Sequence, residues 1–563
     1  MNAERLLALY ERVAEAPYAI TRLRRFILDL AVRGKLVPQD PQDEPASELL
    51  KRIAKEKARL VKAGKFREPN SAIRIKREAL GFSPPEHWGW ASLIEIARPS
   101  YGFAFSSDRF NTAKRGMPLI RIRDISSTDT EAYFEGEYDP AYLVTAGDYL
   151  VGMDGDFKLR RWGGGSGLLN QRVMRINDWR CGINPEFVKL PLQSILDQLH
   201  GQTSLTTVKH LSAKQVNGID IPLPPLAEQH RIVAKVDELM ALCDQLEAAR
   251  QERESRRDRL AVARLARLNA PDPETFQSDA RFTLNALPAL TSRPNQIKQL
   301  RQTILNLAVR GKLVPQDPQD EPASELLKRI IREKTRSIGR NKSLPEIQDS
   351  EKAFDMPAGW CWLRMGNVFS IRTGFAFKSS TYTETGTLIF RVTNFDRDGK
   401  FDLSNAVFFP TEKIDSKISG FSMKSGEIIM VMVGGTIGKT TVVDETILPA
   451  LLNQNMWRIR SFGGILPSKF EYLLIKNINQ SIQGLTQSTH GHFAMSDYEK
   501  RVFALPPLAE QHRIVAKVEE LMALCERLEA SLTTSDQTRT RLLEATLAEA
   551  LAPASVSEME PAE

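Results

Sequence analysis

The stretch LPPLAEQHRIVAKV occurs twice in this chain without a change, at residues 223–236 and at residues 505–518. After one exchange, Asp237 for Glu519, the two copies continue as ELMALC. A second block, LAVRGKLVPQDPQDEPASELLKRI, occurs at residues 30–53 and again at 307–330. Internal repeats of this kind indicate the architecture of a chain before any local pattern does. The sequence therefore predicts a tandem of two units, each a near-invariant frame around a more variable part.

The repeated stretch is predicted to begin a long helix. Pro224 and Pro225 end a strand pattern and allow a helix to start directly after them. Apolar residues then recur in steps of four and three, which is typical of a coiled-coil seam. In the first copy these residues are Ile232, Val236, Leu239, Cys243 and Leu246, and in the second copy Ile514, Val518, Leu521, Cys525 and Leu528. At ~1.5 Å per residue, a helix over residues 227–268 is about 60 Å long.

The parts between the helices are predicted to be mixed, mainly β domains, because turn residues and short β-branched runs increase there. They correspond weakly between the two units, through WGW and WCW (88–90 and 360–362), GFAF (102–105 and 374–377) and LLNQ (168–171 and 451–454). The fold class is therefore α+β. The predicted regions are a helical region (1–84), a first globular domain (85–222), a long helix (223–270), a linker (271–295), a second helical region (296–340), a second globular domain (355–504), a long helix (505–551) and a tail (552–563).

Bulk properties narrow the class of protein. The net charge of +7 suits a polyanionic partner without being diagnostic. Residues 86–220 nevertheless hold 15 Lys and Arg against 16 Asp and Glu, so any positive surface of the first domain must be local. No apolar run approaches the ~18 residues of a membrane span, and no signal peptide is evident. We therefore expect no membrane partner. Cys243 and Cys525 hold the same position in the two copies, so we interpret them as buried thiols of a cytoplasmic protein.

The contrast between constant helices and variable domains suggests a division of labour. Near-identical helices present one docking surface twice, while differing domains read two different things. A long antiparallel coiled coil would hold the two readers at a fixed separation, and successive major-groove faces of DNA recur about every 34 Å. The alternative is a recent duplication whose divergence has no functional meaning.

These features together resemble the specificity subunit of Type I restriction–modification systems. The resemblance rests on GKLVPQ after the first helix, a domain that opens at a tryptophan, LLNQ in its later half, and PPLAEQHRIV at the start of the coiled coil. It implies two target-recognition domains in a pseudo-two-fold arrangement, each reading one half of an asymmetric bipartite site in double-stranded DNA. It also implies helices that set the spacer and dock two modification (methyltransferase) subunits, which restriction (ATP-dependent translocase and nuclease) subunits join. By resemblance this chain is not an enzyme and binds no cofactor.

Three stretches that suggest catalysis are rejected. NPEF (184–187) resembles the motif of amino-methyltransferases, but no glycine-rich cofactor loop precedes it. GGTIGKT (434–440) resembles a phosphate-binding loop, but Val433 stands where the pattern requires glycine. THGH (489–492) lacks an acidic or cysteine partner for a metal. The sequence predicts no catalytic, cofactor or metal residues.

Contacts to DNA need basic residues and paired donors or acceptors near flexible loops. The candidates are Lys158, Arg160, Arg161 and Trp162 in the first domain, and Arg391, Thr393, Asn394, Lys439, His490 and His492 in the second. Gln171 and Gln454, shared by both domains, are expected to hold structure or a phosphate rather than specify sequence. The candidates for partner docking are Glu228, Gln229, His230 and Arg231, with Glu510, Gln511, His512 and Arg513 in the second copy.

Two other interpretations stay open. A non-enzymatic coiled-coil scaffold with two ligand-binding domains has the same architecture and predicts no DNA affinity. A specificity subunit of a modification-only system fits the same residues. A stand-alone methyltransferase or nuclease is disfavoured by the missing cofactor loop and the missing metal–carboxylate cluster.

Overall fold

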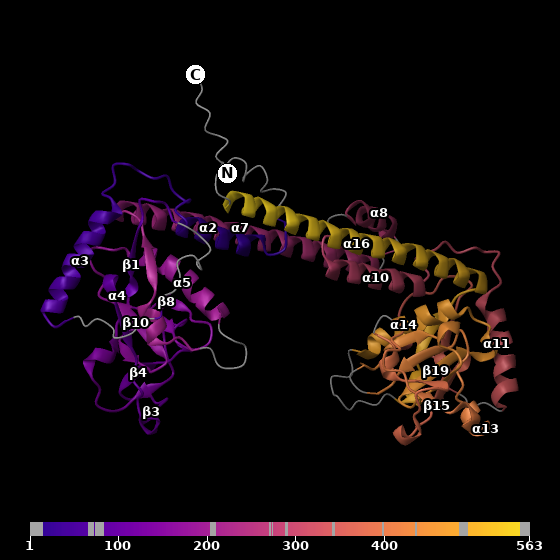
Figure 1. Ribbon diagram of the computed structural model, residues 1–563. Helices are drawn as coiled ribbons and strands as arrows, with labels where there is room; N and C mark the ends of the chain where they lie inside the picture. The colour runs from indigo at the N-terminus through magenta and orange to yellow at the C-terminus, as the bar shows by residue number, and fades with distance from the viewer. Residues whose placement is uncertain are drawn as a thin grey trace. The chain divides into compact units, whose positions relative to one another are not determined.

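The computed structural model divides the chain into two units of helices and short strands (Figure 1). Unit 1 comprises residues 1–252 and 536–563, and unit 2 comprises residues 253–535. The structure describes residues 15–65, 73, 84–202, 210–269, 272, 274–287, 291–339, 344–396, 399–433, 436–483 and 494–551. The tandem that the repeats predict is therefore present.

Unit 1 consists of a helical frame and a globular domain. The helices are α2 (Ala19–Val32), α3 (Ala46–Lys62), α4 (Leu93–Ile96), α5 (Pro185–Gln202), α6 (Ala213–Asn217) and the first part of α7 (Leu226–Asn269). The strands are β1 (Gly89–Ser92), β2 (Arg98–Tyr101), β3 (Phe110–Asn111), β4 (Met117–Ile120), β5 (Tyr133–Phe134), β6 (Leu143–Val144), β7 (Tyr149–Gly152), β8 (Leu159–Arg161), β9 (Gly167–Leu169), β10 (Val173–Asn177) and β11 (Asp220–Leu223).

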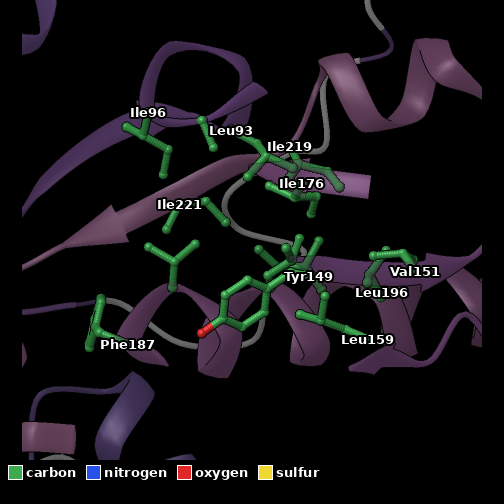
Figure 2. Close-up of a cluster of buried hydrophobic side chains, with 14 of the residues drawn as sticks. Leu93, Ile96, Tyr149, Val151, Leu159, Ile176, Phe187, Leu196, Ile219 and Ile221 are labelled. Carbon is green, nitrogen blue, oxygen red and sulfur yellow. The ribbon is translucent and has the colours of Figure 1, made fainter. Parts of the chain in front are cut away.

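The strands of unit 1 form three small sheets. β1 pairs with β11, a four-stranded sheet has the order β2-β10-β7-β8, and a five-stranded sheet has the order β3-β5-β4-β9-β6. Within the last sheet β4 and β9 are parallel, so their carboxyl ends lie at one edge. The core forms where α5 covers the four-stranded sheet, with Phe187 and Leu196 of the helix facing Tyr149 and Leu159 of the sheet (Figure 2).

The seam of α7 lies against α2. Ile232, Val236 and Cys243 are buried in the same cluster as Ile27 and Ala31. Arg24 of α2 pairs with Asp244, whereas Arg231, earlier in α7, pairs with Asp43 in the segment that follows α2, so the two helices run antiparallel. The predicted seam is therefore confirmed as an apolar contact surface, and the helix it meets inside unit 1 is the short helix of the frame.

Unit 2 repeats this plan. Its helices are α8 (Phe276–Asn285), α10 (Pro294–Val309), α11 (Ala323–Ile338), α12 (Met365–Val368), α13 (Ser416–Ser419), α14 (Ser468–Gln483), α15 (Met495–Glu499) and the first part of α16 (Leu508–Leu551). Its strands are β12 (Cys361–Arg364), β13 (Phe369–Thr373), β14 (Thr387–Phe390), β15 (Phe408–Phe409), β16 (Ile428–Val431), β17 (Thr440–Val442), β18 (Ala450–Leu452), β19 (Met456–Ser461) and β20 (Val502–Leu505).

The sheets of unit 2 repeat those of unit 1, except that the five-stranded sheet has a three-stranded counterpart, β15-β14-β18. The pair β12–β20 repeats β1–β11, the order β13-β19-β16-β17 repeats β2-β10-β7-β8, and the parallel pair β14–β18 repeats β4–β9. The two long helices, α7 and α16, have 44 residues each, and each begins directly after its duplicated proline pair. The α+β fold predicted from the sequence is thus confirmed in both units.

The segment predicted as a linker, residues 271–295, contains a helix that its composition did not predict. Helix α8 lies inside it and packs against the end of α7. The guanidinium carbon of Arg264 lies 3.9 Å from the centre of the Phe282 ring, and Arg267 Nη1 donates to Asp279 Oδ1 at 3.2 Å. These contacts stabilise a short helix in a stretch whose proline and serine content suggested a plain connection.

Candidate nucleic-acid interface

Four of the basic residues predicted to reach DNA, Lys158, Arg160, Arg161 and Lys439, lie on two equivalent β-hairpins. The hairpins β7–β8 and β16–β17 occupy the same place in their sheets. Lys158 and Lys439 each come directly before the second strand of their hairpin. Arg160 and Arg161 continue along β8, whereas β17 carries no cation. The two lysines chosen separately from the sequence are therefore structural counterparts.

The cations of the first hairpin are exposed, and their contacts are surface ion pairs and one hydrogen bond from Arg160 Nη1 to the backbone oxygen of Leu159, at 2.9 Å. Lys158 Nζ lies 2.6 Å from a carboxylate oxygen of Asp156, and Arg161 Nη1 lies 3.6 Å from Glu186 Oε1. Arg160 is exposed beside a groove between α2 and α5. Exposed ion pairs contribute about 0–1 kcal/mol, so these cations remain available to a phosphate.

Trp162 is not a DNA contact, which corrects the sequence prediction. Its side chain is 3% exposed and packs in a cluster with Leu150 and Leu169. Its ring Nε1 donates to the backbone oxygen of Gly165 at 2.8 Å. The ring directly follows two exposed arginines, yet its indole N–H is satisfied inside the domain.

The candidates of the second domain come together in one turn, but most of them brace it. Asn394 is fully buried, and its Oδ1 accepts from the backbone N–H of Arg391 at 2.9 Å. Its side-chain amide donates to Asp402 O at 3.3 Å, and Arg391 Nη2 donates to Asn405 O. Asn394 is therefore wrongly predicted as a base contact, and Arg391 is largely engaged within the domain. Within residues 391–394, Thr393 is the exposed residue.

Lys439 fixes the same turn from the neighbouring hairpin. Its Nζ donates to the backbone oxygen of Val392 at 2.7 Å and lies 4.3 Å from the centre of the Phe395 ring. A lysine held in this way is a structural clamp more than a free phosphate ligand. Residues 434–435 of the glycine-rich stretch lie outside the described residues, as do His490 and His492.

Unit 1 contains the same turn, which sequence reasoning missed. Asp124 Oδ2 accepts from the backbone N–H of Arg121 at 3.0 Å, as Asn394 does from Arg391. Arg121 and Asp124 are thus the counterparts of Arg391 and Asn394, and Arg123 is the counterpart of Thr393. Counting from the shared GFAF and LLNQ does not align the two turns, because the spacing to both motifs differs between the units. The shared feature is an arginine directly after β4 or β14, three residues before Asp124 or Asn394.

The two motifs shared by the globular domains pack against each other. The backbones of Phe103 and Asn170 form an isolated parallel β-bridge, and those of Phe375 and Asn453 form the equivalent bridge. A Cβ atom placed on Gly102 would lie 1.9 Å from Asn170 O, and the equivalent distance from Gly374 is also 1.9 Å. Only glycine allows this approach. Gln171 and Gln454 follow at the same edge and are exposed.

Glu228 and Glu510 are buried, which corrects their prediction as partner-docking residues. Glu228 Oε1 accepts from Trp88 Nε1 at 3.2 Å, and Glu510 Oε2 accepts from Trp360 Nε1 at 2.8 Å. Gln39 and Gln316 donate to the same two carboxylates. Burial raises the pKa of Glu510. Each carboxylate joins the two duplicated blocks to the tryptophan that opens the globular domain. These contacts explain why the glutamate, the glutamine and the tryptophan are the same in both units.

Gln229 and Gln511 are also buried and cannot dock a partner. The side-chain amide of Gln229 donates to Pro224 O at 3.1 Å, and that of Gln511 donates to Pro506 O at 2.9 Å. The Oε1 atom of Gln229 accepts from the backbone N–H of Asn184 at 3.0 Å. Asn184, the first residue of NPEF, therefore helps to anchor the start of α5, in agreement with the rejection of a catalytic role.

The remaining docking candidates divide into internal and exposed groups. Arg231 forms two hydrogen bonds with Asp43, at 3.0 and 2.6 Å, and Arg513 forms the same pair with Asp320. The hydrogen bond from Arg231 lowers the pKa of Asp43. His230 and His512 are the exposed docking candidates, and His230 Nδ1 lies 3.1 Å from the side-chain nitrogen of Asn184.

The part of the chain that the structure describes contains neither a metal-ligand cluster nor a membrane-spanning helix. There, no three or more His, Cys, Asp or Glu side chains are grouped so that they could hold a metal ion. Within the same ranges no helix is both long and apolar enough to cross a lipid bilayer.

Comparison with known proteins identifies the class. The family model described as "Type I restriction modification DNA specificity domain" matches residues 85–253 and 357–534. The specificity subunits of the Type I restriction enzymes EcoAI and EcoEI of Escherichia coli are 33% and 31% identical to this chain, and each alignment covers 94% of this chain and 93% of the relative. A solved chain of a Type I restriction–modification system, 18% identical, has a TM-score of 0.50 over 84% of this chain and 100% of its own length, which shows a shared fold.

The chain therefore belongs to the Type I restriction–modification DNA specificity family. Its role is DNA recognition as a specificity subunit, and it is not an enzyme, since catalysis in such systems lies in other subunits. The sequence resemblance is confirmed, and the scaffold interpretation without DNA affinity is not favoured.

Proposed function

We propose that each globular domain, at residues 85–222 and 355–504, reads one half of an asymmetric bipartite site in double-stranded DNA. The observation that supports this is the combination of a constant frame and variable exposed side chains. The hairpins, the braced turn and the GFAF–LLNQ edge occur in both units, whereas Arg160 and Arg161 have no basic counterparts. Lys158, Arg160 and Arg161 contact DNA in the first half-site, and His490 and His492 remain candidates in the second.

The helical frame docks two modification subunits, one for each unit. Exposed ion pairs recur on both copies: Lys51 with Glu48 and Lys328 with Glu325, each at 2.7 Å. His230 and His512 lie exposed on the duplicated helix starts. Because the same surface is presented twice, it suits two copies of one partner. Restriction subunits join this assembly, and the helices set the spacer between the half-sites.

Methylome sequencing of the source cell, with this gene present and deleted, tests the proposal. The expected result is loss of N6-methyladenine at one split, asymmetric motif on deletion. Re-expression of the gene should restore methylation at that motif. An unchanged methylome in a cell whose modification subunit is expressed and active would refute the proposal.

A further inference from the structure

One turn occurs in both recognition domains with the same bracing and a different exposed side chain. It follows β4 in unit 1 and β14 in unit 2. In each case a side-chain oxygen at the fourth position, Asp124 or Asn394, accepts from the backbone N–H of the arginine at the first position. Both acceptor residues are buried, at 7% and 0% exposure. The turn is therefore a rigid platform rather than a mobile loop.

The third position of this platform is exposed and differs between the domains. It is Arg123 in unit 1 and Thr393 in unit 2. Among the described residues, neither side chain has a hydrogen-bond or ion-pair partner. A free donor on a fixed backbone is what base readout needs, because reading requires a preorganised side chain. A residue that distinguishes two half-sites must also differ between two domains of the same fold, and this one does.

The same edge of each domain carries a constant polar residue. Because β4 is parallel to β9, the turn and the LLNQ motif follow the carboxyl ends of adjacent strands. The backbone N–H of Asn170 donates to Ile120 O at 3.2 Å, directly before the turn. Gln171 then follows as an exposed residue that is unchanged in unit 2 as Gln454. Phosphate contacts position a protein on DNA and base contacts specify sequence. The constant glutamine therefore suits a phosphate contact, and the variable third position of the turn suits a base contact.

We infer that Arg123 and Thr393 are base-reading residues at equivalent positions of the two recognition domains. Arg123 donates two hydrogen bonds to O6 and N7 of a guanine in the major groove of one half-site. Thr393, which is shorter and has one hydroxyl group, makes a single contact to a base in the other half-site. This inference rests on the proposed function, since it assigns residues to the reading of the two half-sites.

The test uses the chain assembled with its modification subunits and a set of duplexes in which each base pair of the methylated motif is changed in turn. For Arg123→Thr, the expected result is loss of roughly tenfold to hundredfold discrimination at one G·C pair of one half-site, with the other half-site read as before. For Thr393→Arg, the base preference should change at one position of the other half-site only.

Two matched variants serve as controls. Asp124→Asn supplies the acceptor that unit 2 uses at this place and should keep the wild-type motif. Arg98→Thr removes an arginine of the same domain whose side chain is 63% exposed, and it should not change base preference. The inference is overturned if Arg123→Thr weakens all duplexes equally or behaves as Arg98→Thr does. A wild-type complex that reads no split motif would instead overturn the proposed function, and this inference with it.

Discussion

Replacement of Gly102 by alanine should disrupt one recognition domain and spare the other. The new Cβ atom would lie 1.9 Å from Asn170 O, whereas an ordinary contact needs about 3.5 Å. The two segments must therefore separate by about 1.5 Å. That movement breaks the hydrogen bonds from Gly102 N to Val173 O, at 3.1 Å, and from Phe103 N to Leu169 O, at 2.9 Å. At about 1–3 kcal/mol for each buried group left unpaired, the domain loses about 2–6 kcal/mol.

Hydrogen exchange measured by mass spectrometry reports this loss locally. In Gly102→Ala, exchange should rise in β2, β9 and β10 and stay unchanged in unit 2, while the complex should lose specificity for one half-site only. Gly374→Ala, with the same clash against Asn453 O, should give the mirror result. Gly165→Ala is the control, because no atom lies within 4 Å of its added Cβ. If Gly102→Ala exchanges and binds as Gly165→Ala does, the close approach of the shared motifs is not needed.

Three further predictions concern the core, the frame and the docking surface. Trp162→Ala should lower the free energy of unfolding by about 3–5 kcal/mol, measured by thermal unfolding, because it removes a buried aromatic side chain. A smaller loss would mean that the ring is exposed. The raised pKa of Glu510 means that the folded state holds the proton more tightly, so unit 2 loses stability as the pH rises past the unfolded value near 4.5. Glu510→Gln should flatten that dependence in melting curves between about pH 4 and 7, and an unchanged slope would contradict it. Lys51→Glu and Lys328→Glu should each leave the melting temperature unchanged and reduce bound modification subunits from two to one, counted by mass of the complex; two bound subunits in either variant would refute docking at these lysines.

The helical frame was predictable from the sequence because its signals are local. Proline pairs and the four-and-three spacing of apolar residues set the start and the buried face of α7. Gly34 has a φ of 66°, the left-handed conformation that a glycine commonly adopts just after a helix. The helix that meets the seam was not predictable, since spacing reveals an apolar face without naming its partner. Helix α8 was missed for a similar reason, because long-range contacts from α7 stabilise it.

The candidate site was less predictable, because residue type does not reveal burial. Trp162 and Asn394 have the chemistry of DNA contacts, yet both are buried and satisfied inside their domains. Glu228 lies in the most constant stretch of the chain, and its constancy reflects an internal hydrogen bond to Trp88. Arg123 was overlooked because it stands in a run of ordinary charged residues. Its equivalence to Thr393 becomes visible only in the structure, where the same side-chain to backbone hydrogen bond holds both turns.

The end of α16 belongs to unit 1, where Leu543 packs on Ala16 and Ala19 and Lys35 Nζ donates to Leu551 O at 3.0 Å. The two residues of this hydrogen bond are 516 positions apart in the sequence. A ribosome adding about 5–20 residues per second needs roughly 25–100 s to cover that distance. Unit 1 is therefore completed only after α16 has been translated. A product terminated before α16 would leave Ala16 and Ala19 without the cover of Leu543, so that such a truncated chain differs from the full one at the start of α2.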